Sequence, residues 1–292
     1  MKHDKAIIWI ILFLLPTLLL FIAIYGLPLL TVIATAFTDW RLSKPLTFVG
    51  LDNFKRLLFQ DDNARRAILN TVVWVLIQST LHVALGTLLA FLAFRRKRIW
   101  NALSISYMIP NIISPVVRGM IFLFVFNPQY GLVNSFIRRF INPEFTQNWF
   151  FDPSTAFFTV TLGWFLFAAI VMLLIHAQMA TISQSILESA MIDGASDFQI
   201  KIHIILPLIK PMIGTCIILS ATSMLKEFEF IYVTTQGGPG NVTLSLPLYL
   251  YKTALLENNY GYANTIGVLL IVFGILIILG INRLFLVNKD AE

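Results

Sequence analysis

Long apolar runs with almost no charge fill most of this chain and limit what it can fold into. Each run reaches the roughly 20 residues that a helix needs to cross a bilayer. Because backbone groups in lipid must bond within the protein, and the runs lack the period-2 alternation of a barrel, they predict helices. Charged residues make up 12% of the chain, against about 25% in soluble domains, which also favours a membrane protein.

Six runs of this kind predict an all-α integral membrane protein with six transmembrane helices. They occupy residues 6–38, 67–94, 99–126, a part of 153–187, 202–225 and 258–282. The first contains Ala34-Thr35-Ala36, which looks like a signal-peptide cleavage site, but its apolar region far exceeds the usual length of roughly 7–15 residues. We therefore expect this run to be retained as a membrane helix.

The orientation follows from the short loop Arg95-Arg96-Lys97-Arg98, whose consecutive cations predict retention in the cytoplasm. Six spans then place both termini and the loop around Glu188 on that same side. Such basic loops, next to membrane lipid, explain the net charge of +6, so no nucleic-acid partner is expected. The single Cys216 excludes an internal disulfide framework and a cysteine-based metal site.

The polar segment at residues 178–201 separates the fourth and fifth runs and is too polar to span a membrane. An apolar stripe recurs in it at near-helical spacing: Leu187, Ala190, Met191 and Ala195. Gly194 permits a sharp change of direction, and Asp193 is expected to cap the helix that follows. Glu188 is placed to pair with a basic group on a partner. The alternative is an ordinary cytoplasmic loop with a short surface helix.

An ordered set of residues in and after this segment matches a known pattern: Glu188, Ser189, Ala190, Asp193, Gly194, Ala195, Pro207 and Pro211. The set resembles the EAA cytoplasmic loop of bacterial ABC importer permeases, with serine at position 189 where alanine is usual. The resemblance implies a coupling helix seated in a groove of an ATPase subunit. There Glu188 would make the polar contact, Ala190 and Ala195 would pack, and Gly194 would make the bend. The two prolines each remove one intrahelical hydrogen bond, which predicts a stiff, kinked lever into the fifth span.

A second resemblance covers the last third of the chain and narrows the family. Its residues are Phe228-Glu229-Phe230-Ile231-Tyr232, Gly237-Gly238-Pro239 and Leu248-Tyr249-Leu250-Tyr251, with Asn127-Pro128 and Tyr130-Gly131 earlier in the chain. They resemble the sugar-importer permeases of the maltose, lactose and glycerol-phosphate branch in its short six-helix form, although Glu229 stands where aspartate is frequent. The resemblance implies the type I ABC importer fold, as one transmembrane domain over residues 1–292 with a coupling loop at residues 178–201.

That family implies a permease subunit that forms half of the translocation path for a mono- or oligosaccharide. Glycerol 3-phosphate or a phosphodiester stays open as the alternative substrate. The expected partners are a second homologous permease in a heterodimer, two ATPase subunits and an extracytoplasmic substrate-binding protein. The expected location is the cytoplasmic (inner) membrane of a bacterium or archaeon, with both termini in the cytoplasm.

The sequence contains no G-x-x-x-x-G-K-[ST] phosphate loop, so we expect a transport subunit that hydrolyses no ATP itself. ATP and magnesium would bind the partner ATPase, and no cofactor or metal is expected in this chain. A secondary transporter would usually show internal repeats. An intramembrane enzyme would need clustered carboxylates or a Ser/His/Asp set. Neither signal is clear, and both functions remain as alternatives.

Polar side chains inside the apolar runs are candidates for lining a substrate path, because such groups usually face a cavity or a partner. The candidates are Gln78, Asn111, Ser114, Arg118, Glu227, Glu229 and Tyr232. The spacing of Asn111, Ser114 and Arg118 predicts one shared helix face, and we expect Asn111 and Glu229 to be the better candidates. The alternative is hydrogen bonding between helices, or an internal ion pair of Arg118 with Glu227 or Glu229. Rings available for stacking on a sugar are Trp164, Tyr107 and Tyr232.

Overall fold

The computed structural model describes residues 2–94 and 97–285, with side chains for residues 10–94 and 98–285. Arg95 and Arg96, on which the predicted orientation depends, lie outside the described residues. The chain forms two compact units: Met1–Asp61 with Leu250–Ile271, and Asp62–Tyr249 with Val272–Glu292. The single domain expected over residues 1–292 stays a prediction beside this division.

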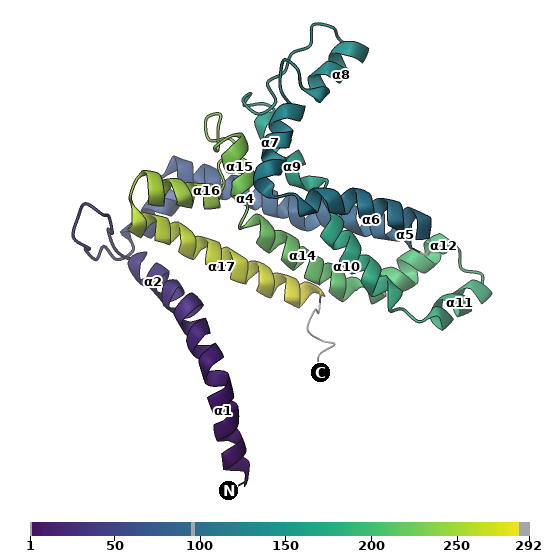
Figure 1. Ribbon diagram of the computed structural model, residues 1–292, viewed down its shortest axis with the longest axis horizontal. Helices are drawn as coiled ribbons and strands as arrows, with labels where there is room; N and C mark the ends of the chain where they lie inside the picture. Colours follow the sequence, from purple (N-terminus) through teal and green to yellow (C-terminus); the bar gives the residue numbers. More distant parts are fainter. Residues whose placement is uncertain (1, 95–96, 286–292) are drawn as a thin grey trace. The chain divides into compact units, whose positions relative to one another are not determined.

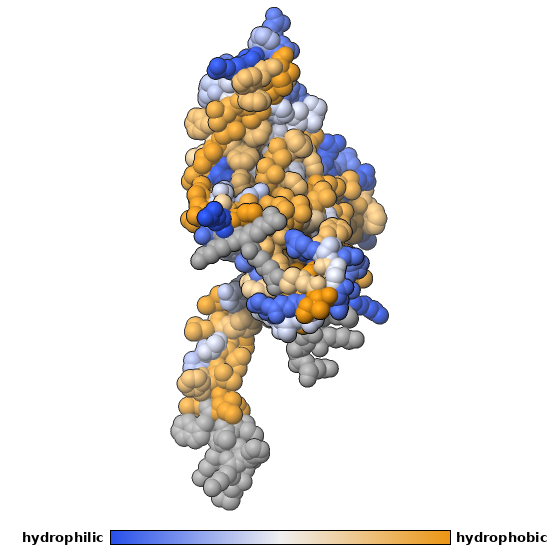
Figure 2. Space-filling view, turned by 90° about the vertical axis from the view of Figure 1, so that its right-hand side faces the viewer, coloured by the Kyte–Doolittle hydropathy of each residue, from blue (hydrophilic) through white to orange (hydrophobic). Residues whose placement is uncertain are grey.

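The described part of the chain is mainly helical, and each apolar run of the sequence forms helix. Four helical segments are each long and apolar enough to span a membrane: Ile10–Thr35, Asp62–Ala93, Ala156–Ala180 and Tyr260–Phe285. Two further spans are bent pairs. Arg98–Ile112 meets Pro115–Val125 at 103°, and Asp197–Leu208 meets Lys210–Thr234 at 67°. With each bent pair taken as one span, the six runs correspond to six spans, and Figure 2 shows the apolar surface that contact with lipid requires.

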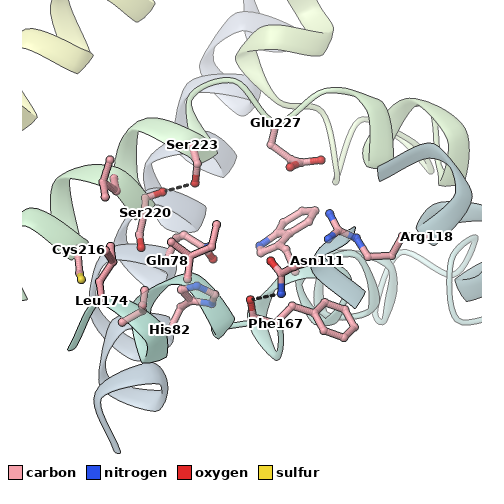
Figure 3. A pocket seen from close by; sticks show the side chains of 14 residues that line it. Gln78, His82, Asn111, Arg118, Phe167, Leu174, Cys216, Ser220, Ser223 and Glu227 are labelled. Atoms are coloured by element: carbon pink, nitrogen blue, oxygen red, sulfur yellow. Dashed lines mark hydrogen bonds between the residues drawn. The ribbon is translucent and has the colours of Figure 1, made fainter. Parts of the chain in front are cut away.

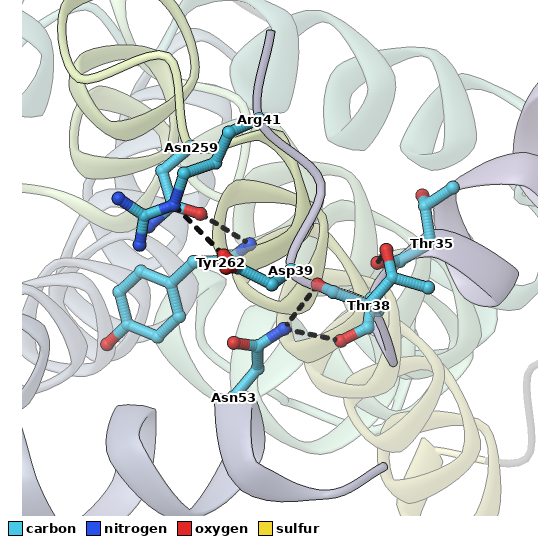
Figure 4. A network of polar contacts seen from close by, with 8 residues as sticks. Thr35, Thr38, Asp39, Arg41, Asn53, Asn259 and Tyr262 are labelled. Atoms are coloured by element: carbon cyan, nitrogen blue, oxygen red, sulfur yellow. Dashed lines mark hydrogen bonds and ion pairs between the residues drawn. The ribbon is translucent and has the colours of Figure 1, made fainter. Parts of the chain in front are cut away.

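The first unit contains the N-terminal span, the loop that follows it and the start of the last span. Its helical pieces are α1 (Lys2–Phe21), α2 (Leu27–Thr35), α3 (Asp52–Lys55) and the π-helical turns Ile22–Gly26, Arg56–Gln60 and Lys252–Leu256. The carbonyl of Thr38 lies so close to Gly261, in α17 (Tyr260–Phe285), that a Cβ there would have no room. Asn53 donates to the carbonyls of Ala36 and Thr38, so backbone groups leaving the first span find partners (Figure 4).

The second unit contains the remaining helices, and several of its spans are interrupted. In chain order they are α4 (Asp62–Ile77), α5 (Val83–Ala93), α6 (Lys97–Ile112), α7 (Pro115–Val125), α8 (Leu132–Phe140), α9 (Ala156–Phe165), α10 (Ala169–Ala180), α11 (Gln184–Ile192), α12 (Asp197–Gln199), α13 (Leu206–Leu208), α14 (Lys210–Met224), α15 (Glu229–Thr234) and the start of α16 (Leu246–Tyr251). Two π-helical turns, Gln78–His82 and Ile200–Ile205, continue α4 and α12.

Two groups of helices pack within this unit (Figure 1). Helices α5, α6, α10 and α14 enclose a buried apolar cluster that includes Met172, Ile175 and Ile209. Helices α7, α9 and α15 pack together at Phe230, whose ring lies so close to Gly163 that a Cβ at this glycine would have no room. Because α6, α10 and α14 belong to the same spans as α7, α9 and α15, each span passes from one group to the other at its interruption.

Candidate functional site

Four spans of the second unit lose regular α-helix at the walls of one cavity. The interruptions are the π-helical turn Gln78–His82 and the breaks at residues 113–114, 166–168 and 225–228. The cavity has a volume of about 230 Å³, and polar side chains from each of these spans face it (Figure 3). Irregular backbone at membrane depth is tolerated where it is buried in protein or lines a water-filled space. The arrangement therefore indicates a polar compartment within the membrane-spanning part of the chain.

Two side chains that line the cavity donate hydrogen bonds to carbonyl groups at the break between α9 and α10. The polar residues that line the cavity are Gln78, His82, Asn111, Arg118, Trp164, Ser220, Ser223 and Glu227. His82 Nδ1 donates to the carbonyl of Phe165 at 2.9 Å, and Asn111 Nδ2 donates to the carbonyl of Phe167 at 3.3 Å. These carbonyls have lost their helical partners because α9 ends at Phe165. His82 and Asn111 thus stabilise the interruption as well as line the cavity.

Other polar atoms at the cavity have no partner. Gln78 Oε1, Arg118 Nε, Trp164 Nε1 and Glu227 Oε1 are buried and form no hydrogen bond with any described residue. Within the described part of the chain, only Thr253 Oγ1 shares this condition elsewhere. A buried polar atom without a partner costs about 1–3 kcal/mol. Four such atoms around one cavity indicate that water or a ligand supplies the missing bonds.

Arg118 and Glu227 face the cavity from different spans without forming an ion pair (Figure 3). Among the described residues, Arg118 is bridged neither to Glu227 nor to Glu229, so the predicted internal ion pair is absent. The guanidinium carbon of Arg118 instead lies 5.7 Å from the ring centre of Phe167 and 5.8 Å from that of Phe230. Arg118 and Glu227 therefore remain available to a ligand.

The other predicted path residues lie elsewhere. Ser114 caps α7 by accepting from the backbone N–H of Val117 at 3.3 Å. The shared face expected for Asn111, Ser114 and Arg118 is wrong, because the 103° bend separates the helices that carry them. Glu229 is exposed at the start of α15, and Tyr232 stacks on Phe228 with ring centres 5.2 Å apart. Glu229 and Tyr232 stay predictions as path residues, and neither lines this cavity.

The cavity also has lining residues that the sequence does not single out. Ser220 and Ser223 are three residues apart in the fifth span, a pattern in an apolar run that gives a weak signal. Phe167 lies in the break after α9 and gives no signal of its own. Of the rings expected to stack on a sugar, Trp164 lines the cavity, whereas Tyr107 packs against the buried apolar cluster.

The segment predicted to lie in the cytoplasm and to couple to an ATPase forms α11 and α12, separated by a tight turn. Gly194 adopts a left-handed conformation with φ +83°, which a glycine adopts without strain. Its N–H donates to the carbonyl of Met191 and the N–H of Ala195 donates to that of Ala190, which closes the end of α11. The bend predicted at Gly194 is confirmed. The cap predicted for Asp193 is wrong, because Ser196 and Gln199 form a reciprocal capping box at the start of α12.

The side chains of this segment divide between the protein's own core and its surface. Leu187 and Ala190 are buried against the apolar cluster of α5, α10 and α14, and Ala195 packs beside them. Ala190 is thus covered by its own chain and Ala195 is half-buried, and the packing on a partner that the resemblance implied for them stays a prediction. Glu188 is exposed and accepts a hydrogen bond from Gln184 at 2.6 Å. The exposed apolar residues of the segment are Ile186, Met191, Ile192 and Phe198.

The two predicted lever prolines flank the bend of the fifth span. Pro207 lies in α13, Pro211 lies in the first turn of α14, and Ile209 separates the two helices. A proline in the first turn of a helix loses no hydrogen bond, which explains why α14 restarts there. The bend of 67° confirms the predicted kink, and the role of this kink as a lever stays a prediction.

Comparison with known proteins identifies the family of this chain. The family described as "Binding-protein-dependent transport system inner membrane component" matches residues 82–286, which is most of the chain. The chain belongs to this family. It is 29% identical to a probable ABC transporter permease of Pyrococcus horikoshii, with 96% of each chain covered. It is 31% identical to the trehalose/maltose transport system permease MalF of Thermococcus litoralis, with 84% of this chain and 87% of that one covered.

A solved structure supports the same assignment at the level of the fold. A chain of a bacterial alginate ABC transporter, in complex with an alginate pentasaccharide-bound periplasmic protein, matches with a TM-score of 0.84 at 22% identity. The match covers 99% of this chain and 97% of that chain, so this permease has the predicted type I ABC importer fold. As a binding-protein-dependent permease, the chain is a multi-pass transport subunit and not an enzyme.

Proposed function

We propose that this permease forms half of the translocation path of an ATP-driven importer for a mono- or oligosaccharide. The observation that carries the proposal is the polar cavity at which four spans lose regular helix. Discontinuous membrane helices typically build the substrate sites of transporters. Sugars bind through hydrogen bonds and through stacking on rings, for which Gln78, Arg118, Glu227 and Trp164 supply the groups. The relative from Thermococcus litoralis is named for trehalose/maltose transport, which supports a carbohydrate.

The proposal assigns the coupling to ATP hydrolysis to α11 and α12. ATP and magnesium bind separate ATPase subunits, which drive transport only if they prefer one state of the path over another. Moving an equilibrium from 1:99 to 99:1 requires about 5.5 kcal/mol of differential binding. The exposed Ile192 and Phe198 offer apolar docking surface, and Glu188 offers a polar contact. The kink at Ile209 then links this surface to the span that carries Glu227.

The complete importer in this proposal contains a second homologous permease, two ATPase subunits and an extracytoplasmic substrate-binding protein. The chain lies in the cytoplasmic membrane with both termini and the α11–α12 segment on the cytoplasmic side. The cationic residues at positions 95–98 support this orientation, because short basic loops are retained in the cytoplasm.

Reconstitution tests the proposal. The chain is co-expressed with the adjacent transport genes, purified as a complex and inserted into liposomes, and ATP-dependent uptake is measured with the binding protein outside. We expect the ATPase and a second permease to copurify, and a sugar carried by the binding protein to accumulate only with ATP inside. Uptake of sn-glycerol 3-phosphate but of no sugar, or sugar uptake that needs no ATP, would contradict the proposal.

A further inference from the structure

We infer that the cavity selects an uncharged, polyhydroxylated sugar over acidic sugars and phosphate esters, through a balanced set of unpartnered donors and acceptors. The inference rests on the proposed function and specifies the substrate class of the same site. It also separates the two classes of substrate that the sequence leaves open.

The four unpartnered atoms divide evenly by chemistry. Arg118 Nε and Trp164 Nε1 are donors only, and Gln78 Oε1 and Glu227 Oε1 are acceptors when the carboxyl is ionised. Gln78 is 7% exposed and Trp164 is 5% exposed, so bulk water does not reach these side chains freely. A ligand that meets all four atoms must therefore donate hydrogen bonds on some sides and accept them on others.

Hydroxyl groups meet this demand, because each one both donates and accepts. A phosphate or carboxylate group only accepts, so where it takes the place of a hydroxyl it can satisfy Arg118 and Trp164 but cannot donate to Gln78 Oε1. A cationic ligand would satisfy the acceptors and leave both donors unpaired. An unmatched buried polar group is the strongest source of discrimination that a hydrogen-bonding site has.

The charges of the lining lead to the same conclusion. Arg118 and Glu227 carry the formal charges among the residues that line the cavity, and the two balance. They face the cavity without forming an ion pair, so a ligand lies within the field of both (Figure 3). A neutral ligand keeps the balance, whereas an anion adds a net charge that the lining does not compensate, and an uncompensated buried charge is costly. Ordered water also donates and accepts, so it satisfies the same atoms before a sugar displaces it.

A binding experiment without the binding protein tests the inference on the cavity itself. The purified complex in lipid nanodiscs is titrated with three neutral probes, maltotriose, cellobiose and N,N′-diacetylchitobiose, and with two anions, trigalacturonate and sn-glycerol 3-phosphate. The test variant is Glu227→Gln. Glu144→Gln is its matched control, because it makes the same change on an exposed side chain outside the cavity.

We expect the wild type to bind at least one neutral probe about tenfold more tightly than either anion. Glu227→Gln should reduce that ratio about fivefold by tightening the anions, a gain that simple damage to the fold cannot produce. Glu144→Gln should leave the ratio unchanged. An anion bound best by the wild type, no saturable binding of any neutral probe, or an unchanged ratio in Glu227→Gln would overturn the inference.

The two proposals fail in different ways. ATP-driven sugar uptake by the complete importer, together with any of these overturning results, removes the selective cavity and keeps the proposed function. Absence of ATP-driven uptake of any sugar carried by the binding protein removes the proposed function itself.

Discussion

In the α11–α12 segment, residues of the segment itself form hydrogen bonds with the backbone groups at the helix ends. At the cavity, by contrast, four buried side-chain atoms have no partner among the described residues. Gly194 closes the end of α11, and Ser196 with Gln199 closes the start of α12. An ordered segment loses less conformational entropy when the proposed ATPase subunit docks on it. A site that binds and releases cargo needs donors and acceptors that are not already hydrogen-bonded within the protein. Substitutions in the two regions should therefore separate coupling from binding.

The largest expected effect is that of Gly194→Val. A β-branched residue in the left-handed conformation costs about 1–2 kcal/mol, and about 1.4 kcal/mol corresponds to a factor of ten. Apart from Gly194 and its two chain neighbours, no described residue has an atom within 4 Å of the added Cβ, so the cost is conformational and not steric. We expect ATP-driven uptake to fall about tenfold while sugar binding in nanodiscs stays unchanged. Gly194→Asn is the control, because asparagine tolerates this conformation; equal uptake in both variants would remove the role assigned to the turn.

Gln78→Leu tests the cavity instead of the α11–α12 segment. The substitution removes a buried oxygen that only ordered water can satisfy in the empty state; releasing that water recovers about 0–2 kcal/mol of immobilisation entropy, so the melting temperature of the empty complex should rise. It also removes one bond to the ligand, worth about 0.5–1.5 kcal/mol, so affinity for a neutral sugar should fall about fivefold. Gln60→Leu, at an exposed position, is the control for both measurements. A less stable empty complex with unchanged affinity would show that Gln78 has a structural partner.

Ile192→Ser tests whether the exposed apolar residues of the segment contact an ATPase. Ile192 is 86% exposed, so the change should leave the stability of this chain intact. Full burial of such a side chain is worth about 1.5–3 kcal/mol, and partial burial in a docking groove should weaken ATPase association about fivefold. Copurification and ATPase titration measure the effect. Leu42→Ser, 72% exposed in the loop after the first span, is the control. Equal ATPase affinity in the two variants would place the docking surface elsewhere.

Ser196→Ala should have the smallest effect. Loss of an N-terminal cap costs about 0.5–2 kcal/mol, but it acts on a three-residue helix that the following turn continues. We expect hydrogen exchange at the backbone amide of Gln199 to rise about fivefold and uptake to fall less than twofold. Ser185→Ala is the control, because among the described residues the Ser185 hydroxyl bonds only to that of Ser183. A loss of uptake as large as that of Gly194→Val would mean that the whole segment unfolds with its cap.

The sequence predicts the spans well and the cavity only in part. Hydropathy is a property of each run by itself, so all six runs correspond to helical spans. Glu227 and Glu229 are equivalent as polar residues at the end of one run, yet only Glu227 lines the cavity. Asn111 and Arg118 do line it, although for a different reason than the shared helix face that their spacing suggested. The break between them lies where Pro115 starts a new helix that Ser114 caps, and the 103° angle of the break is a property of the folded chain.

The sequence by itself determined the class of protein, the number of spans, the turn at Gly194 and the family resemblance. These features depend on local hydropathy and on the conformational freedom of single residues, which neighbouring helices change little. Only the tertiary structure decided that Ala190 faces its own chain and that polar atoms of four spans stay unpaired around one cavity. Those outcomes depend on where separate spans bend relative to one another, and residues far apart in the chain decide that together.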